Sequence, residues 1–397
     1  MTVSPDASSS DVASTASSTD DAEHHAQVAR PSDSLRDTED LRERLERWMA
    51  GKVPSGSTVT VADVTLPAAN GMSSETILFD ATWDGDHHPL VARVAPTEST
   101  MPVFPTYDLE SQFRTMAQVR EHSAVPVPAV YWSESDPDAL GAPFFVMERI
   151  SGDVPPDVMP YNFGSWVTEA SPEQRNILQQ NSVGVLAQLH AIDKPCERFD
   201  FLRLPNSGTT AREAFTAHIA EQRAYYEWVV SDGVRSPLIE RALDWIEENN
   251  PADDSPAVLC WGDSRIGNVM YQDFAPVAVL DWEMATLGPR EMDLGWMAFL
   301  HRFFEDIAGL ANLPGLPDFL RLPDLAQTYA EITGHTPHDL EFYVTYAALR
   351  QAVIMWRIQA RAIAFGQSQR PEDPDDMIMH RASLAAMLDG TYWERLA

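Results

Sequence analysis

The spacing of the apolar residues changes near residue 150, and this change limits the folds open to the chain. Before it, short runs rich in Val, Thr, Ile and aromatic residues alternate with turn residues, as β-strands do. After it, apolar residues recur every three or four positions over long stretches, as on the buried face of a helix. The pattern predicts an α+β protein with a small strand-rich lobe at 34–150 and a large, mainly helical lobe at 151–397.

The small lobe is expected to hold about five antiparallel strands and one helix. The predicted strands are 58–63, 75–83, 89–95, 129–132 and 144–150. Asp84-Gly85 suits a tight hairpin turn between the second and third strands. A helix over 108–121 follows the third strand and ends before two prolines, which supply no backbone donor. A further helical run precedes the first strand and stops at Gly51.

The large lobe is expected to be helical, with one interruption. The predicted helices are 172–191, 210–230, 237–249, 292–306, 338–366 and 378–390. Residues 258–282 break the helical pattern with short apolar runs and a polar loop, and we expect the chemistry there because functional side chains concentrate on loops. Residues 1–33 are mostly Ser, Thr, Ala, Asp and His, a composition that predicts a disordered tail.

The net charge of the chain limits the classes of partner that we expect, and its cysteines indicate its location. Its 397 residues carry 28 Lys and Arg against 60 Asp and Glu, a net charge of −32. Such a surface repels phosphate backbones and anionic lipid, which argues against binding to nucleic acid or to membranes. No run of about 18 apolar residues and no secretory signal is visible. The two cysteines form neither a disulfide framework nor a zinc motif, so we expect a cytoplasmic protein.

Three oxygen-bearing side chains stand close together in the interrupted region. Asp263 and Asn268 share one loop, and Asp281 ends the next apolar run. A hairpin between the two would bring all three together. Carboxylate and amide oxygens are the ligands that Mg²⁺ prefers, and a carboxylate left free of the metal can accept a hydroxyl proton. The group is therefore equipped for metal-assisted phosphoryl transfer.

The same residues resemble a known family. Gly262-Asp263-x-x-x-x-Asn268 followed by Asp281 resembles the catalytic and metal motifs of the aminoglycoside phosphotransferase family, which has the bilobal protein-kinase-like fold. The segments 267–288 and 346–361 are similar to one branch of it, which includes uncharacterised bacterial phosphotransferases and the kinase-like domains fused to certain acyl-CoA dehydrogenases. The resemblance covers roughly 40–390.

The resemblance implies a role for each residue of the motif. Asp263 is the catalytic base or orients the substrate hydroxyl, while Asn268 and Asp281 hold Mg²⁺. Asp293 matches an Asp that braces the catalytic loop from the start of a helix, a place that suits a carboxylate. Glu283 supports the metal site, faces the substrate or is simply a structural carboxylate.

The small lobe is expected to supply the ATP site. By the resemblance, Ser73 and Ser74 belong to the nucleotide-positioning loop, although a plain hairpin turn has the same pattern. Arg93 stands where kinases carry a lysine on the third strand. The two lysines of the chain, Lys52 and Lys194, precede the sheet and lie in the helical lobe, so neither can take this place. Arginine is a permanent cation whose planar fork can hold phosphates.

The remaining residues of the nucleotide site are predicted from their positions in the sequence. The partner of Arg93 on the next helix is either Glu110 or Gln112, because residues two apart do not share a helix face. Met147 is expected behind the adenine, and the backbone of Glu148 and Ile150 is expected to bind the base.

We expect no catalytic role for two residues near the motifs. Trp261 replaces the histidine that usually precedes Gly-Asp in the family, and this predicts altered packing around an intact site. His190 is interpreted as a core histidine at a helix end.

These expectations combine into a kinase of small molecules. It would transfer the γ-phosphate of ATP to an alcohol hydroxyl in a pocket over Asp263, walled by the helical lobe. The acceptor is open among aminoglycosides, macrolides, amino alcohols, sugars and hydroxyacyl thioesters, with a tilt towards a small or lipid-like metabolite. ATP or GTP, and the oligomeric state, stay open. The alternative is a nucleotide-binding pseudokinase or scaffold, which Arg93 favours and the intact Asp263, Asn268 and Asp281 oppose.

Overall fold

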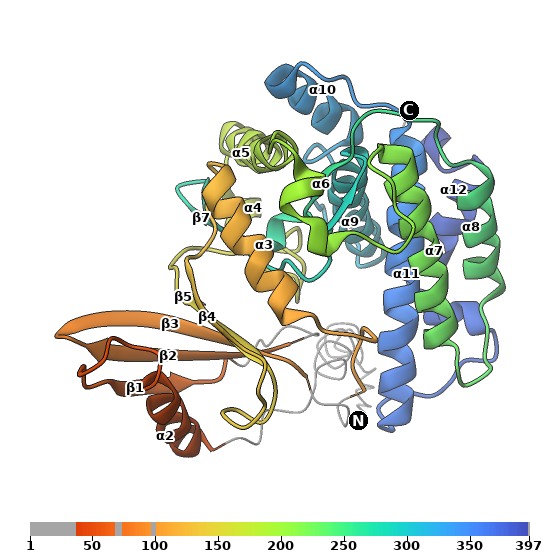
Figure 1. The fold of residues 1–397 in the computed structure, drawn as a ribbon. Helices are drawn as coiled ribbons and strands as arrows, with labels where there is room; N and C mark the ends of the chain where they lie inside the picture. The colour runs from red at the N-terminus through yellow and green to blue at the C-terminus, as the bar shows by residue number, and fades with distance from the viewer. Residues whose placement is uncertain (1–36, 68–73, 97–100, 396–397) are drawn as a thin grey trace, which may run out of the picture.

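The computed structural model describes residues 37–67, 74–96 and 101–395. The predicted tail at 1–33 and the predicted phosphate-binding Ser73 lie outside the described residues. Figure 1 shows a twisted sheet at one end of the molecule, a cluster of helices at the other, and α3 between them. The α+β fold predicted from the sequence is confirmed, while the division at residue 150 stays a prediction.

The sheet has five strands, and every pair of neighbours is antiparallel. The strands are β1 (Thr60–Thr65), β2 (Glu75–Trp83), β3 (Asp86–Val94), β4 (Val130–Glu134) and β5 (Phe144–Glu148). Their order is β1-β2-β3-β5-β4. Asp84 (φ 55°) and Gly85 (φ 86°) form the predicted two-residue turn between β2 and β3, whose positive φ angles match the twist of a hairpin.

The two faces of the sheet contribute to different cores. Successive side chains of a strand point to opposite faces. Leu90 of β3 packs with Leu45 of helix α2 (Thr38–Met49), in a core of the small lobe. Val91 and Met147 instead join a core that continues through α3 (Leu109–His122) into the helical lobe. The sheet is therefore fixed on one side to α2 and on the other to the large lobe.

The large lobe contains the six predicted long helices and several that the sequence does not predict. The six are α5 (Pro172–His190), α7 (Ala211–Val229), α8 (Pro237–Glu248), α9 (Glu291–Leu310), α11 (Leu340–Ala364) and α12 (Arg381–Leu388). The others are α4 (Trp166–Glu169), α6 (Pro195–Arg198), α10 (Leu322–Thr333) and the short 3₁₀ turns η2 (Asp200–Leu202), η4 (Pro374–Met377) and η5 (Trp393–Arg395). α10 escapes sequence analysis because it buries only Leu325 and Tyr329, too few for a clear helical period.

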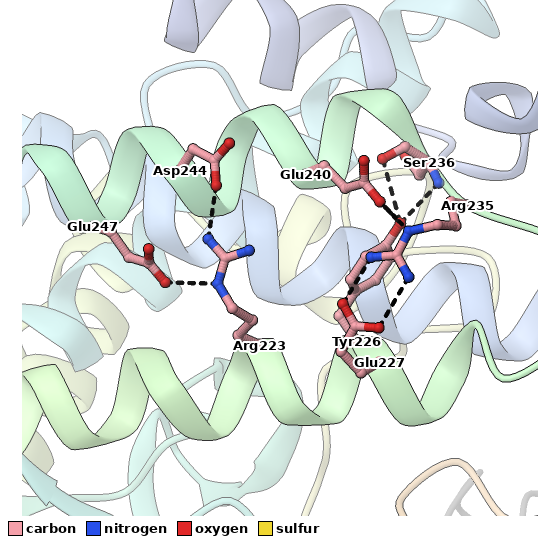
Figure 2. A network of polar contacts seen from close by, with 8 residues as sticks. All are labelled: Arg223, Tyr226, Glu227, Arg235, Ser236, Glu240, Asp244 and Glu247. Carbon is pink, nitrogen blue, oxygen red and sulfur yellow. Dashed lines mark hydrogen bonds and ion pairs between the residues drawn. The ribbon is translucent and has the colours of Figure 1, made fainter.

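Part of the acidic surplus is used on the outer faces of helices. Figure 2 shows Arg223 of α7 between Asp244 and Glu247 of α8, at 2.8 and 2.7 Å. Arg235, in the connection between the same helices, pairs with Glu227 and Glu240. Exposed pairs of this kind contribute at most about 1 kcal/mol each. Each arginine is thereby balanced by two carboxylates at this surface.

Two short antiparallel strand pairs interrupt the helices and shape the region where the motifs lie. β6 (Val258–Cys260) pairs with β9 (Thr286–Gly288), and β7 (Val269–Gln272) pairs with β8 (Ala275–Val279). The 3₁₀ turn η3 (Ile266–Asn268) precedes β7. The loop after β6 and the turn after β8 are thereby brought side by side. Among the described residues, no helix is both long enough and apolar enough to cross a bilayer.

Candidate active site

The two strand pairs bring Asp263, Asn268 and Asp281 together. The Asn268 side-chain Nδ2 donates to Asp263 Oδ2 at 2.7 Å and to the Asp263 backbone carbonyl at 3.1 Å. The Leu280 amide, one residue before Asp281, donates to the Asn268 carbonyl at 2.9 Å. The three residues predicted to carry the chemistry therefore share one hydrogen-bonded unit.

Gly262 is required by the backbone of this loop. Its φ is +89°, in the region that L-residues rarely adopt. A Cβ atom at this position would lie 1.9 Å from the backbone carbonyl oxygen of Met284. The absence of a side chain thus lets the loop carrying Asp263 approach the turn that follows Asp281.

Side chains from three directions fix the Asp263 carboxylate. Trp296, on α9, donates its indole N–H to Asp263 Oδ1 at 2.7 Å. Arg265 donates its Nε–H to both carboxylate oxygens at 3.1 Å and also pairs with Asp157. Together with Asn268, these contacts hold a nearly buried carboxylate in one orientation. Trp296 and Asp157 were missed by sequence reasoning, because nothing in their local patterns shows where their side chains end.

Asp293 holds the backbone of the same loop from the first turn of α9. Its carboxylate accepts the Trp261 amide at 2.8 Å and the Gly262 amide at 2.9 Å. It also lies 3.1 Å from Nε2 of His190, whose Nδ1 contacts the Tyr329 hydroxyl. The carboxylate is fully buried, so its hydrogen bonds are made in an environment of low dielectric. Asp293 thus lies where the resemblance places a brace, and His190 is a core histidine that contacts this brace.

Trp261 connects the loop to the turn at Asp281. Its indole N–H donates to the Leu280 carbonyl at 2.9 Å and lies 3.2 Å from the Asp281 carbonyl. The side chain is buried and packs against Trp282. The tryptophan therefore supplies a hydrogen-bond donor between the loop and the turn.

Asp281 carries features of a cation ligand. It adopts a φ of 60°, and its Oδ1 atom is buried without a hydrogen-bond partner among the described residues. The nearest cation is Arg93, whose Nη2 lies 3.7 Å from that oxygen. Burial raises the pKa of the Asp281 carboxyl, Arg93 opposes the rise, and the neighbouring Asp263 adds to it. A buried carboxylate oxygen beside an amide and a second carboxylate is a donor set that fits Mg²⁺.

A cleft of about 340 Å³ lies between the sheet and these residues. Asn268 and Asp281 line it from the large lobe, and Arg93 lines it from β3. Arg93 donates to the Thr76 hydroxyl at 3.1 Å, which holds its guanidinium at the cleft wall. Met147, Glu148 and Ile150 also line the cleft. Most residues predicted to contact the nucleotide therefore face one cavity.

Three predicted residues need a closer description. Ser74 is buried, and its hydroxyl has no hydrogen-bond partner within the described residues. Gln112 is buried and lines the cleft, whereas Glu110 is exposed and accepts a hydrogen bond from Ser133 at 2.5 Å. The structure thus places Gln112, and not Glu110, on the side of Arg93.

The backbone amide of Glu148 already donates a hydrogen bond within the protein. Its N–H donates to the Ala129 carbonyl at 2.8 Å, and its side chain accepts the Ala129 amide at 3.2 Å. A contact of Glu148 with a base is thereby limited to its carbonyl group.

A second cavity of about 500 Å³ adjoins the first and shares Gln112 and Trp282 with it. Aromatic side chains form much of its wall: Phe104, Tyr107, Phe201, Tyr225, Trp228 and Trp282. Glu221, Glu283 and Arg350 supply charge. Arg350 Nη1 lies 3.4 Å from the Gly262 carbonyl, so the cavity reaches the loop that carries Asp263. Burial raises the pKa of the Glu221 carboxyl, against the opposing charge of Arg350.

The comparison with protein families gives one match. The model of the APH family, described as the phosphotransferase enzyme family, matches residues 65–342. This range includes Arg93, Asp263, Asn268, Asp281 and Asp293. The family resemblance drawn from the sequence is confirmed.

Solved structures of phosphotransferases share the fold. A structure assigned as an aminoglycoside phosphotransferase from Ralstonia eutropha has a TM-score of 0.62 and 22% identity over 89% of this chain and 98% of its own. Aminoglycoside phosphotransferase APH(4)-Ia with AMP-PNP and hygromycin B has a TM-score of 0.52 and 16% identity over 87% and 98%. Macrolide 2'-phosphotransferase MphH from Brachybacterium faecium has a TM-score of 0.51 and 18% identity over 88% and 98%. At these identities the likeness shows the fold alone.

Curated relatives carry acyl-CoA dehydrogenase names. The Arabidopsis thaliana protein named "Probable acyl-CoA dehydrogenase IBR3" is 25% identical over 74% of this chain and 35% of its own length. Acyl-CoA dehydrogenase family member 10 of Mus musculus is 23% identical over 81% and 28%. Family member 11 of Homo sapiens is 26% identical over 45% and 21%. The chain therefore matches about a third or less of these longer proteins.

Proposed function

Because the chain belongs to the APH phosphotransferase enzyme family, we propose that it is an ATP-dependent kinase of a small-molecule alcohol. The observation that carries this proposal is the convergence of Asp263, Asn268 and Asp281 beside a cleft under the sheet. A cytoplasmic location is part of the same proposal.

Asp263 is proposed to act on the acceptor hydroxyl. The hydroxyl oxygen forms a bond to the γ-phosphorus, the bond from that phosphorus to the departing ADP oxygen breaks, and the hydroxyl proton passes to the Asp263 carboxylate. Trp296 and Asn268 hold the carboxylate while this happens. A fixed orientation of the carboxylate accelerates such a reaction, because phosphoryl transfer depends mainly on positioning and electrostatics.

Asn268 and Asp281 are proposed to hold Mg²⁺. When bound, the ion would supply positive charge that neutralises the charge developing on the phosphates. The Oδ1 of Asp281 supports this role, since this buried oxygen accepts no hydrogen bond among the described residues, has only Arg93 at 3.7 Å as an opposite charge and is stabilised when a cation binds it. Asp293 and Trp261 position the loop and the turn that carry the two ligands.

The nucleotide is proposed to lie in the 340 Å³ cleft. Arg93 would contact its phosphates, and Met147 would pack behind the base, which the Glu148 carbonyl and the backbone of Ile150 would bind. Ser73 and Ser74 keep their proposed role at the phosphates, and Gln112 takes the place proposed for the partner of Arg93.

The acceptor is proposed to enter the 500 Å³ cavity. Its aromatic walls favour an acceptor with an apolar face, and Glu283 is placed to contact it. This agrees with a small or lipid-like metabolite, and the names of the dehydrogenase relatives point the same way. The solved relatives with hygromycin B or named for macrolides keep both drug classes among the candidates.

The test is Mg²⁺-dependent release of ADP with pooled acceptors. The pools are aminoglycosides, macrolides, amino alcohols, sugars and hydroxyacyl thioesters, and Asp263→Asn is the control variant. We expect turnover with one pool, a loss of about 10²–10⁴-fold in the variant, and nearly unchanged ATP binding. Equal turnover in the variant would remove Asp263 from its role.

A pseudokinase is the alternative that one observation favours. Arg93 pairs across the cleft with Asp281, and α3 presents Gln112 in place of a carboxylate. Binding of ATP without turnover of any pool would support this reading.

A further inference from the structure

Besides Asp263, Asn268 and Asp281, another group of side chains of the types that bind metals lies outside the two cavities, at the start of α9. It consists of Glu291, His335 and His338, whose ligand atoms all lie within 4.8 Å of one another. His335 and His338 come from the connection between α10 and α11, and Asp253 approaches from the segment before β6. None of these four residues has a role in the proposed reaction.

The distances suit one small metal ion. His335 Nε2 lies 2.9 Å from Glu291 Oε1, and His338 Nε2 lies 3.8 Å from the same oxygen. His338 Nε2 is also 3.8 Å from Asp253 Oδ2. In a tetrahedral zinc site, bonds of about 2.0–2.1 Å place neighbouring ligand atoms about 3.3 Å apart. The two separations from Glu291 Oε1 lie on both sides of that value, so small side-chain shifts would bring Glu291, His335 and His338 to the distances of such a site, while Asp253 lies beside His338 outside this group of three.

The ring of His338 is already oriented for a metal. Its Nδ1 lies 2.9 Å from Asp339 Oδ2 and donates its proton to that carboxylate. This contact leaves Nε2 facing Glu291 and Asp253. A histidine whose far nitrogen donates to a carboxylate is the usual arrangement at protein metal sites, because it fixes the tautomer and makes the ligating nitrogen more basic.

The negative charges of the cluster favour the binding of a cation. Glu291 is only 1% exposed, and a buried carboxylate is costly without an opposite charge. The lone pair of neutral His338 would face two carboxylates, which is unfavourable unless a proton or a metal lies between them. The cluster therefore attracts a cation to the space between His338 and the two carboxylates.

We propose that Glu291, His335 and His338, with Asp253 beside them, bind a divalent transition metal of the Zn²⁺ class. Two imidazoles with a carboxylate favour such an ion over Mg²⁺ or Ca²⁺, which prefer oxygen ligands alone. The metal would replace the direct contact between His335 and Glu291 and join three separate segments of the large lobe.

The position of the site gives the metal a structural consequence. Glu291 is two residues before Asp293, whose carboxylate holds the Trp261 and Gly262 amides. Asp253 lies shortly before β6, which leads into the same loop. A metal bound here would restrain the start of α9, which carries Asp293, and lie beside the segment at Asp253 that leads into β6. We expect it to stabilise the fold.

The test is Zn²⁺ binding by the full chain after treatment with a chelator. His24-His25 in the N-terminal segment could bind zinc independently, so His24→Gln/His25→Gln is the background for every measurement. His338→Gln and His335→Gln are the site variants. His87→Gln, which changes an exposed histidine on β3, is the matched control. Stoichiometry and affinity come from calorimetry, and Co²⁺ substitution reports tetrahedral coordination by its visible absorption.

We expect one zinc per chain in the background and in His87→Gln. Each site variant should lose at least about tenfold in affinity. Zinc should raise the melting temperature of the background and of His87→Gln, but not that of the site variants. Metal-free melting curves establish that each variant is folded.

Two results would overturn the proposal. One is equal zinc affinity in the background and in both folded site variants, which would place the metal elsewhere. The other is failure of the background to bind zinc or cobalt, which would identify the cluster as a protonated histidine held by carboxylates.

Discussion

Trp296 and Asp263 are joined by a hydrogen bond of 2.7 Å between the indole N–H and Oδ1. Trp296 comes from α9, the helix that also carries Asp293. A single helix therefore fixes both the side chain of Asp263 and the backbone of its loop. This contact gives α9 a part in orienting the proposed base.

Trp296→Phe tests that contact, because it keeps an aromatic ring and removes the donor. A hydrogen bond to a charged group is worth about 1.5–3 kcal/mol, so we expect kcat to fall about 10–100-fold. The KM for ATP should hardly change, since Trp296 does not line the nucleotide cleft. Steady-state kinetics on the identified acceptor measure both constants. Trp245→Phe on α8 is the control, and an unchanged kcat in Trp296→Phe would contradict the orienting role.

Asp281→Asn tests the proposed metal ligand with little backbone strain, since Asn tolerates positive φ. We expect the variant to fold normally and to lose at least about tenfold in affinity for ATP with Mg²⁺. Asp273→Asn is a matched control, because Asp273 also has a positive φ (49°) and lies in the turn between β7 and β8. Calorimetric titration with and without Mg²⁺ makes the comparison. Equal affinities in the two variants would remove Asp281 from the metal site.

Gly262→Ala tests the close approach of the loop to Met284. The new Cβ conflicts with a backbone oxygen, so the loop must move, and we expect a loss of stability of about 1–3 kcal/mol. Displacement of Asp263 should reduce turnover by about 100-fold. Gly309→Ala, inside α9 with no atom within 4 Å of the added Cβ, should be neutral or slightly stabilising. Urea unfolding compares the two, and equal stabilities would show that the loop accommodates a side chain.

His301 predicts a pH dependence of stability. Burial lowers its pKa to about 3, while the unfolded chain has an ordinary histidine pKa of about 6.5. The unfolded state therefore binds the extra proton as the pH falls below about 6.5, and stability is lost there. In His301→Gln this contribution is absent, so the difference in unfolding free energy from the parent should shrink by about 2 kcal/mol between pH 7 and pH 5. Exposed His87→Gln should show no such change, and parallel curves for parent and His301→Gln would contradict the prediction.

The sequence predicts most of the fold because each long element has a clear period. The five strands alternate or are continuously apolar, and the six long helices bury wide apolar faces. α10 lacks this signal because so few of its residues are buried. Short turns such as η4 depend on local hydrogen bonds that a periodic pattern does not contain.

The candidate site is predictable only where residue type and spacing carry the chemistry. Asp263, Asn268 and Asp281 stand out because few other reasons place them at that spacing. Helix phase alone could not decide between Glu110 and Gln112, since the rotation of α3 against the sheet is set by packing. Trp296 looks like any other core residue of an apolar helix, and only the tertiary structure shows that its N–H meets Asp263.

Arg93 has a consequence for how this protein can be detected. Lys52 pairs with Glu134 at the outer edge of the sheet, and Lys194 pairs with Glu197 in the helical lobe, so neither lines the proposed nucleotide cleft. A guanidinium stays protonated and is a poor nucleophile, unlike a lysine amine. Reagents that tag kinases by transferring an acyl group from a nucleotide to the cleft lysine would leave this chain unlabelled. Surveys of nucleotide-binding proteins that rely on such tagging would pass over an enzyme built in this way.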